Sequence, residues 1–486
     1  MKLLATLVLA FVFLACDGDP SPLASPAMRS EGGDDAGDML VSPDPTGFVA
    51  TVSTNGRIDR GNPFFRSLGT NGRSCASCHL QENAWGLSAE AVRSVFAASG
   101  GNDPLFAAVD GANCPSVTAA DGAQGHSLLL GSGLIRVAVP MPANAEFTVT
   151  AVHDPYGCAL QGSPQSVSMY RRPLPSTNLS FLSAVMFDGR ETIGPLNNGA
   201  TFLTNLRADL AHQAVDATLG HAQASVAPDA AQVNAIVDFE LGLFTAQRVD
   251  NAAGVLNAQG ASGGPDALTS TTYYPGINDP LGGNPTGAAF NLNAFAIYAA
   301  WQNLNSSNRN TAARKAVARG ETVFNTHPLL ITAVAGLNDD LGAPVIPGTC
   351  STCHDTPEIG NHSLPVPLDI GTSHAAAYEP DARIVASLAQ LSVPNLPVFR
   401  VTCTAGSLTG TARYTSDPGR AMITGRCADV GRIKGPILRG LAARAPFFHN
   451  GAAASLEQVV EFYNQRFQMA LTTQEKADLV AFLKAL

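Results

Sequence analysis

Two short sequences constrain this 486-residue chain more than any other feature: Cys75-Ala76-Ser77-Cys78-His79 and Cys350-Ser351-Thr352-Cys353-His354. Each has two thiols three residues apart and an imidazole directly after the second. Thiols at this spacing add to the vinyl groups of a porphyrin and the histidine ligates its iron, so the pattern is typical of c-type haem attachment. A zinc ribbon needs four ligands close together in sequence, whereas these motifs lie in opposite halves of the chain. The sequence therefore predicts two covalently bound haem c groups.

The N-terminus is typical of an exported protein. Lys2 precedes a short apolar run that ends at Ala15, as in a secretory signal, and the run is too short for a permanent membrane-spanning helix. The four residues Phe13-Leu14-Ala15-Cys16 resemble a bacterial lipobox, although leucine is usual where Phe13 stands, so cleavage without lipidation is the alternative. We expect a signal peptide at 1–15, a flexible tether at 16–46 that is rich in Asp, Gly, Ser and Pro, and a periplasmic lipoprotein anchored through Cys16.

The cysteine count fits an oxidising compartment. Of the nine cysteines, Cys16 and the four motif thiols have roles already, which leaves Cys114, Cys158, Cys403 and Cys427. Four cysteines allow three pairings. Proximity in sequence favours Cys114–Cys158 and Cys403–Cys427, one bridge in each half, and each would contribute about 2–4 kcal/mol of stability.

Composition narrows the class of partner. The formal net charge is −10, and no basic run is interleaved with aromatic residues, which argues against nucleic-acid binding. The length is sufficient for two domains, and the motifs place one haem in each.

The pattern of apolar residues predicts an all-α fold with two cytochrome c-type haem domains, the first carrying a small β-containing insertion. We expect the N-terminal haem domain at 47–310, with its insertion at about 98–168, and the C-terminal haem domain at 311–486. Apolar residues at helical spacing predict helices at 206–219, 231–243, 312–324, 456–467 and 476–486. The last two are preceded by capping residues, Ser455 and the Thr472–Glu475 capping box. In the insertion, alternating segments at 134–139 and 147–152 predict strands.

With two haem motifs this far apart, the chain resembles the bacterial di-haem cytochrome c peroxidase family, which includes the MauG-like oxidases. The resemblance covers about 61–486, less the insertion, and rests on segments in family order: 75–79, 178–190 ending in Phe187-Asp188-Gly189-Arg190, 350–354, 433–440, Ala445-Pro446-Phe447-Phe448-His449-Asn450-Gly451 and 456–463. It implies that hydrogen peroxide reacts at the N-terminal haem. It also implies that the C-terminal haem relays electrons from a small redox protein, such as a cytochrome c or a cupredoxin.

The resemblance implies an unusual ligand set for the C-terminal haem. Family peroxidases place a methionine ligand fourteen residues after the histidine that matches His449, and 449 + 14 is Tyr463 here, as in the MauG-like branch. We therefore expect His354 and Tyr463 as metal ligands, with His449 bonding a propionate at the haem edge. A thioether raises the reduction potential, whereas a phenolate favours ferric or higher oxidation states. The alternative is that Tyr463 is only a core residue on an apolar helix face.

The sequence departs from the family pattern at two further places, both in the region between the haems. Phe187 stands where the family usually has a tryptophan that conducts electrons, so direct tunnelling or another aromatic such as Trp85 would have to replace that step. Arg172 and Arg444 occupy two positions that should contribute to the family's calcium site. Because guanidinium groups cannot ligate a cation, we expect no calcium and expect these arginines to meet haem propionates.

On the open face of the N-terminal haem, peroxide cleavage needs a group that moves a proton. The position that matches the family's distal glutamate is Gln223, which lacks a carboxylate, so Gln213 and His221 are the nearest catalytic candidates. The alternative for His221 is a solvent-facing residue at a helix end. No histidine lies between His79 and His126, so we expect a five-coordinate or water-bound iron, with His126 and His153 as the only insertion histidines that could close it.

The leading hypothesis is therefore an exported di-haem oxidoreductase that reacts with hydrogen peroxide at the N-terminal haem, with the C-terminal haem relaying or storing oxidising equivalents. It would act as a cytochrome c peroxidase or as a MauG-like oxidase of a specific substrate, and Tyr463 favours the second. Alternatives are a non-catalytic electron-transfer lipoprotein and a di-haem oxygenase acting on an organic substrate.

Overall fold

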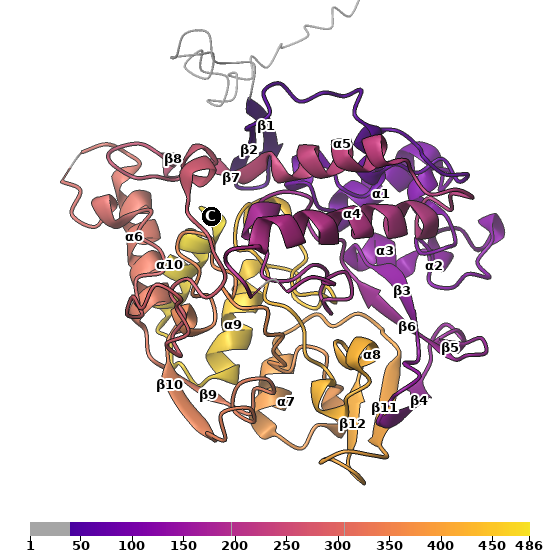
Figure 1. Ribbon diagram of the computed structural model, residues 1–486. Helices are drawn as coiled ribbons and strands as arrows, with labels where there is room; N and C mark the ends of the chain where they lie inside the picture. The colour runs from indigo at the N-terminus through magenta and orange to yellow at the C-terminus, as the bar shows by residue number, and fades with distance from the viewer. Residues whose placement is uncertain (1–38, 196, 306) are drawn as a thin grey trace, which may run out of the picture.

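The computed structural model describes residues 39–195, 197–305 and 307–486 (Figure 1). The expected signal peptide, the lipobox with Cys16 and the tether up to residue 38 lie outside these ranges. Residues 39–46, expected as the end of the tether, instead form a hairpin in which β1 (Met39–Asp44) pairs antiparallel with β2 (Gly47–Ser53). Among the described residues, no helix combines the length and hydropathy needed to cross a bilayer.

The helices expected from apolar spacing are confirmed. They correspond to α4, α5, α6, α9 and α10, and both predicted caps form: Ser455 accepts a hydrogen bond from the Gln458 amide, and Thr472 and Glu475 form a capping box. The α-helices of the described residues are α1 (Ala89–Ser99), α2 (Gly122–Gly125), α3 (Ser127–Ser132), α4 (Phe202–Gly220), α5 (Ala230–Leu241), α6 (Thr311–Thr326), α7 (Ala382–Leu388), α8 (Ala421–Thr424), α9 (Leu456–Arg466) and α10 (Thr473–Lys484).

The expectation of an all-α fold is wrong. Of the described residues, 31% are helical, 3-10 turns included, and 16% are in strands. The sheets of the described residues are β1-β2-β7-β8, β10-β9, β12-β11-β4 and β3-β6-β5. Their remaining strands are β3 (Ile135–Pro140), β4 (Phe147–His153), β5 (Leu160–Gln161), β6 (Ser166–Arg171), β7 (Leu243–Asp250), β8 (Gly254–Val255), β9 (Leu329–Thr332), β10 (Val345–Gly348), β11 (Val398–Cys403) and β12 (Ala412–Thr415). Several are short or pair with strands far away in sequence, so the local pattern did not reveal them.

The insertion is not confined to the N-terminal half. The two strands expected there are β3 and β4, but β4 pairs along its length with β11 from the C-terminal half (Figure 1). Phe147 and Val149 of β4 share one buried cluster with Phe399 and Val401 of β11. This shared core joins the insertion to residues 398–430.

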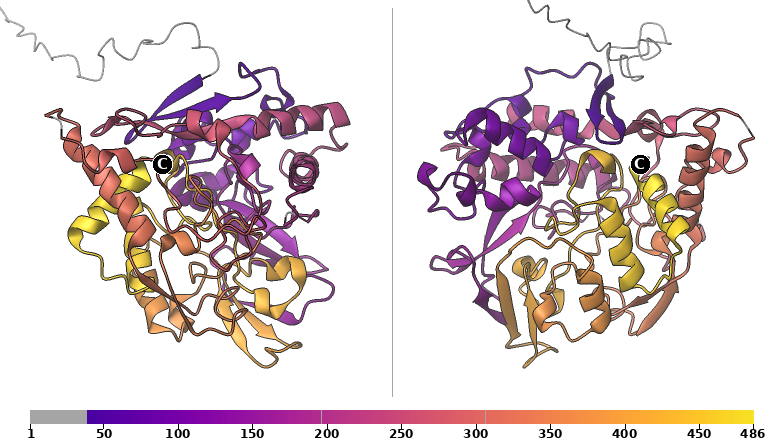
Figure 2. Two further views of the ribbon diagram at one scale, coloured as in Figure 1. Left: turned by 60° about the vertical axis from the view of Figure 1, so that its left-hand side comes forward. Right: turned by 180° about the vertical axis from the view of Figure 1, so that it is seen from behind.

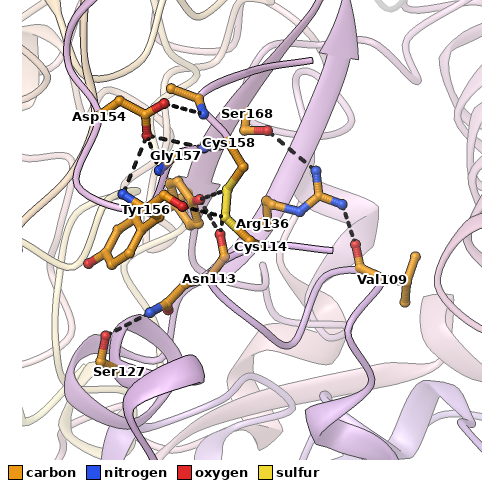
Figure 3. The surroundings of a disulfide bond; sticks show 12 residues. Val109, Asn113, Cys114, Ser127, Arg136, Asp154, Tyr156, Gly157, Cys158 and Ser168 are labelled. Carbon is orange, nitrogen blue, oxygen red and sulfur yellow. Dashed lines mark hydrogen bonds between the residues drawn. A yellow bond between two sulfur atoms is a disulfide. The ribbon is translucent and has the colours of Figure 1, made fainter. Parts of the chain in front are cut away.

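The predicted disulfides are confirmed. Cys114 bonds to Cys158, and Cys403 bonds to Cys427. Figure 3 shows the first bridge beside Asn113, which connects it to α3 through a hydrogen bond from its side-chain amide to Ser127 Oγ (2.8 Å). One bridge closes the insertion and the other closes the segment that follows β11.

The longer helices form two groups on different sides of the molecule. Helices α4 and α5 lie side by side with the N-terminal segments, whereas α6, α9 and α10 gather on the other side (Figures 1 and 2). The C-terminus lies between the groups, where the Leu486 carbonyl accepts hydrogen bonds from the amides of Gln247 (3.2 Å) and Gly440 (2.8 Å). Residues of α4 and α5 line one large cavity, and residues of α6, α9 and α10 line another.

Candidate haem-binding sites

The two Cys-x-x-Cys-His motifs fold in the same way. Each begins with a single 3-10 turn, over Cys75–Ser77 and over Cys350–Thr352. In both, the histidine amide donates to the carbonyl of the first cysteine at 3.0 Å. A hydroxyl inside each turn accepts from the amide that precedes the motif, Ser77 from Ser74 at 3.1 Å and Thr352 from Thr349 at 3.0 Å. Local hydrogen bonds therefore fix both thiols and the imidazole of each motif as one unit.

Each motif lines one large, mainly apolar cavity. Cys75, Cys78 and His79 line the first cavity, and Cys350, Cys353 and His354 line the second. The first encloses about 1510 Å³ and the second about 1820 Å³, counting the space at their mouths. Apolar walls of this size and a motif in each wall fit a covalently held porphyrin.

The two imidazoles are oriented for iron ligation. His79 Nδ1 lies 3.2 Å from the carbonyl of Trp85, and His354 Nδ1 lies 2.6 Å from the carbonyl of Gly360. A carbonyl only accepts, so Nδ1 carries the proton in both and Nε2 keeps its lone pair for a metal. Burial lowers the pKa of both imidazoles, that of His79 to about 4, which keeps them neutral.

The charge of the second cavity also fits a haem. Its lining includes the cations Arg172, Lys434 and Arg444 but no Asp or Glu. In addition, His449 lines this cavity, is buried, and has an Nε2 with no hydrogen-bond partner in the described part of the chain. A porphyrin with two propionates would supply anions for the three cations and a hydrogen-bond partner for His449 Nε2, which lies 3.7 Å from Asp417.

Tyr463 reaches the second cavity from α9. It lines that cavity together with His354, and no described residue forms a hydrogen bond with its hydroxyl. Burial raises the pKa of the phenol, and the neighbouring thiols of Cys353 and Cys350 add to the effect. The ring is therefore both part of a packed helix face and part of the cavity lining.

Phe187 lies near the second cavity and not the first. It lines the second cavity, with its ring centre 6.0 Å from that of His449. The next residue, Asp188, is fully buried and accepts a hydrogen bond from Arg171 at 2.5 Å. Arg171 also donates to both oxygens of Asp417, at 2.6 and 2.8 Å. This Asp188–Arg171–Asp417 triad fixes the Phe187-Asp188-Gly189-Arg190 segment.

Of the candidates for the open face, Gln213 and His221 line the first cavity. His221 Nδ1 hydrogen bonds to Asp110, which also forms an ion pair with Arg73. Gln223, at the position of the family's distal glutamate, is exposed and is not part of this cavity.

The insertion histidines are also outside the cavity lining. His126 hydrogen bonds to the carbonyl of Gly111 at 2.8 Å, and His153 Nε2 lies 2.9 Å from Asn395 Oδ1. Trp85 lines neither cavity. It packs against Phe64 and Phe239 and donates to Thr51 Oγ1 at 2.9 Å.

The side chains of Arg172 and Arg444, which we expected to meet haem propionates, donate hydrogen bonds to backbone carbonyls. Arg444 donates to the carbonyls of Gly440 (3.2 Å), Ile437 (3.1 Å) and Arg439 (2.7 Å). Arg172 donates to the carbonyls of Arg444 and Leu87. Both still line the second cavity, and Arg444 lines both.

Sequence reasoning missed several charged residues in the cavity walls, among them Glu240 and Lys434. Glu240 lines the first cavity, and burial raises its pKa to about 7 despite a hydrogen bond with Ser176. Lys434 lines both cavities. Glu240 continues the apolar face of a predicted helix, and a carboxylate at such a position is a signal of a buried site. Lys434 had no comparable signal beyond its place in a family segment.

Comparisons with known proteins find similarity over part of the chain. No family model matches the chain. It is 41% identical over 78 residues to the cytochrome-c peroxidase IdrP2 of Denitromonas iodatirespirans, covering 15% of this chain and 21% of the relative. It is 32% identical over 148 residues to IdrP2 of Pseudomonas sp. (strain SCT), covering 28% and 35%. It is 41% identical over 69 residues to the cytochrome c551 peroxidase of Nitrosomonas europaea, covering 14% and 21%.

The chain thus matches only about a fifth to a third of the length of these relatives. A solved structure described as a MauG-like protein associated with microbial copper homeostasis aligns over 88% of this chain and 92% of its own, with 14% identity and a TM-score of 0.31. That score supports no statement about the fold. Over these segments the chain is similar to cytochrome c peroxidases.

Proposed function

We propose that this protein is a di-haem c-type oxidoreductase that reacts with hydrogen peroxide at its N-terminal haem. The main support is the pair of apolar cavities, each with a Cys-x-x-Cys-His motif in its wall. Haem c, when bound, supplies an iron that can exchange single electrons with peroxide and with partner proteins. Cys75, Cys78 and His79 would hold the first haem.

Cys350, Cys353, His354 and Tyr463 would hold the second haem. A phenolate at this place favours the oxidised states of the iron, so we propose that the C-terminal site stores or relays oxidising equivalents. The reductant would be a small redox protein, a cytochrome c or a cupredoxin, or a specific oxidisable substrate as in the MauG-like branch.

For the open face, we propose that His221 moves the proton and Gln213 orients the peroxide. Asp110 fixes the ring of His221 through Nδ1, which leaves Nε2 available for exchange. We expect His221→Ala to lower the peroxide turnover rate by about 10²-fold, in the range that a positioned acid–base group contributes. Steady-state peroxide consumption at equal haem content measures this.

Gln223→Ala is the matched control, because Gln223 is near in sequence but exposed and outside the cavity. It should keep the wild-type rate. A His221→Ala protein with unchanged turnover would mean that His221 is only a helix-end residue and would remove it from the mechanism.

One spectroscopic experiment tests the proposed function. Purified, matured protein should contain two haem c groups per chain, and its ferric form should show a high-spin signal that changes on addition of peroxide. Two low-spin, six-coordinate haems that ignore peroxide would instead identify a non-catalytic electron-transfer protein. Oxygen consumption that depends on an organic substrate would identify a di-haem oxygenase.

We further propose an exported, periplasmic protein anchored through Cys16, with haem domains at 47–310 and 311–486. The two disulfides support an oxidising compartment. The presence of one motif and one cavity in each half supports two haem units, although β4 ties the insertion to the second. We also propose that no calcium lies between them, since Arg172 and Arg444 occupy two of the expected ligand positions.

A further inference from the structure

The wall between the two cavities is thin and contains few residues. Six residues line both cavities: Pro173, Leu174, Pro175, Lys434, Pro436 and Arg444. Two proline-containing segments therefore separate the sites. Lys434 and Arg444 are the cations of this shared wall.

The side chains of Arg444 and Lys434 differ in their hydrogen-bond partners. The Arg444 guanidinium donates to three backbone carbonyls. Lys434 is 7% exposed, and its backbone amide donates to the carbonyl of Phe187 at 2.8 Å. Its ammonium has no hydrogen bond or ion pair with any residue in 39–195, 197–305 or 307–486, and burial alone lowers its pKa to about 8.

No carboxylate of the cavity walls serves as a counter-charge for Lys434. The second cavity has no Asp or Glu in its lining. In the first cavity, Asp110 pairs with Arg73 and His221, and Glu240 has a raised pKa and hydrogen bonds with Ser176. An ammonium without a partner in a mainly apolar cavity wall is unfavourable, so this position favours an anion that the described residues do not provide.

We propose that Lys434 is a positioning residue whose ammonium pairs with a haem propionate at the shared wall and thereby sets the reduction potential of that haem. The proposal rests on the proposed di-haem function. A propionate of either haem has the required charge, and the four-carbon side chain carries a compact, flexible ammonium that can approach either cavity. A nearby positive charge favours the reduced iron, because reduction adds a negative charge to the haem.

The test is a redox titration of each haem, followed spectroscopically, in the loaded wild-type protein and in Lys434→Met. The variant should lose at least tenfold in the reduction equilibrium constant of one haem, a downward shift of about 59 mV for a one-electron couple. The haem that shifts is the one whose propionate Lys434 meets, and equal shifts of both would place the ammonium between two propionates. Lys434→Arg should restore most of the shift, because it returns the charge.

Lys315→Met is the matched control, since Lys315 is partly exposed on α6 and lines neither cavity. Its potentials should equal those of the wild type. Unchanged potentials in Lys434→Met with both haems present would overturn this inference alone, whereas wild-type protein without two haems would overturn the proposed function. Should Lys434→Met not retain its haems, Lys434→Gln is titrated in its place, and unchanged potentials there count equally against the inference.

Discussion

Replacing Tyr463 with methionine is expected to raise the reduction potential of the C-terminal haem by on the order of 100 mV or more, since axial ligands set haem potentials over hundreds of millivolts. The ring comes from α9 and lines the same cavity as His354, and no described residue bonds its hydroxyl. The hydroxyl is therefore free of bonds to the described residues and could serve as a ligand to the iron of a bound haem. The exchange replaces an oxygen ligand that favours ferric iron with a thioether that favours ferrous iron.

A redox titration of the two haems measures this shift. Tyr463→Phe is the companion variant, because it keeps the ring that packs beside Phe462 and Phe467 but removes the oxygen. It should convert the C-terminal haem to a high-spin, five-coordinate form. If both variants keep the wild-type spectrum and potential, Tyr463 is only a core residue of an apolar helix face.

Replacing Arg171 with methionine is expected to destabilise the folded protein by about 3–5 kcal/mol, the usual loss when one partner of a buried ion pair is removed. Arg171 is 2% exposed and lies between Asp188 and Asp417, which are 0% and 1% exposed. Although burial acts in the opposite direction, Arg171 lowers the pKa of Asp188 to about 2 and also lowers that of Asp417. Without the guanidinium, two carboxylates would be buried without their main counter-charge.

Urea unfolding of the haem-loaded protein at neutral pH measures this loss. Arg190→Met is the matched control: Arg190 contacts the same Asp188 at 3.2 Å but its side chain is 20% exposed, so its loss should cost less than about 1 kcal/mol.

The depressed carboxyl pKa values add a pH dependence. Their stabilisation is present above the ordinary carboxyl range and declines as the pH falls toward 2, so the gap between wild type and Arg171→Met should narrow in acid. Equal unfolding midpoints for the two proteins would show that the triad contributes nothing net.

The helices were predictable because their signal is local. Apolar spacing and caps located α4, α5, α6, α9 and α10 to within a few residues, and the alternating segments of the insertion identified β3 and β4. Strands β2 and β7, and likewise β4 and β11, pair across long stretches of sequence. Such pairing is stabilised by tertiary contacts that no short window contains, which is why an all-α fold was the wrong expectation.

Some residues of the candidate sites could also be predicted from the sequence, and others could not. The motif residues, together with Tyr463, His449, Phe187, Gln213 and His221, all line one of the two cavities. Gln223, which matches the family's distal glutamate by position but was not a catalytic candidate, lines neither cavity; it follows the end of α4 with a positive φ of 54° and is exposed. Glu240 and Lys434 depend on which segments meet around a cavity, and that becomes visible only in three dimensions.

The pairing of β4 with β11 has a practical consequence for anyone who wishes to dissect the protein. A fragment that stops before residue 398 would leave one edge of β4 bare, and a fragment that starts after residue 168 would leave β11 without a neighbour on that side. Unpaired strand edges recruit other chains and promote aggregation. The halves of this molecule are therefore best produced together, as a single polypeptide.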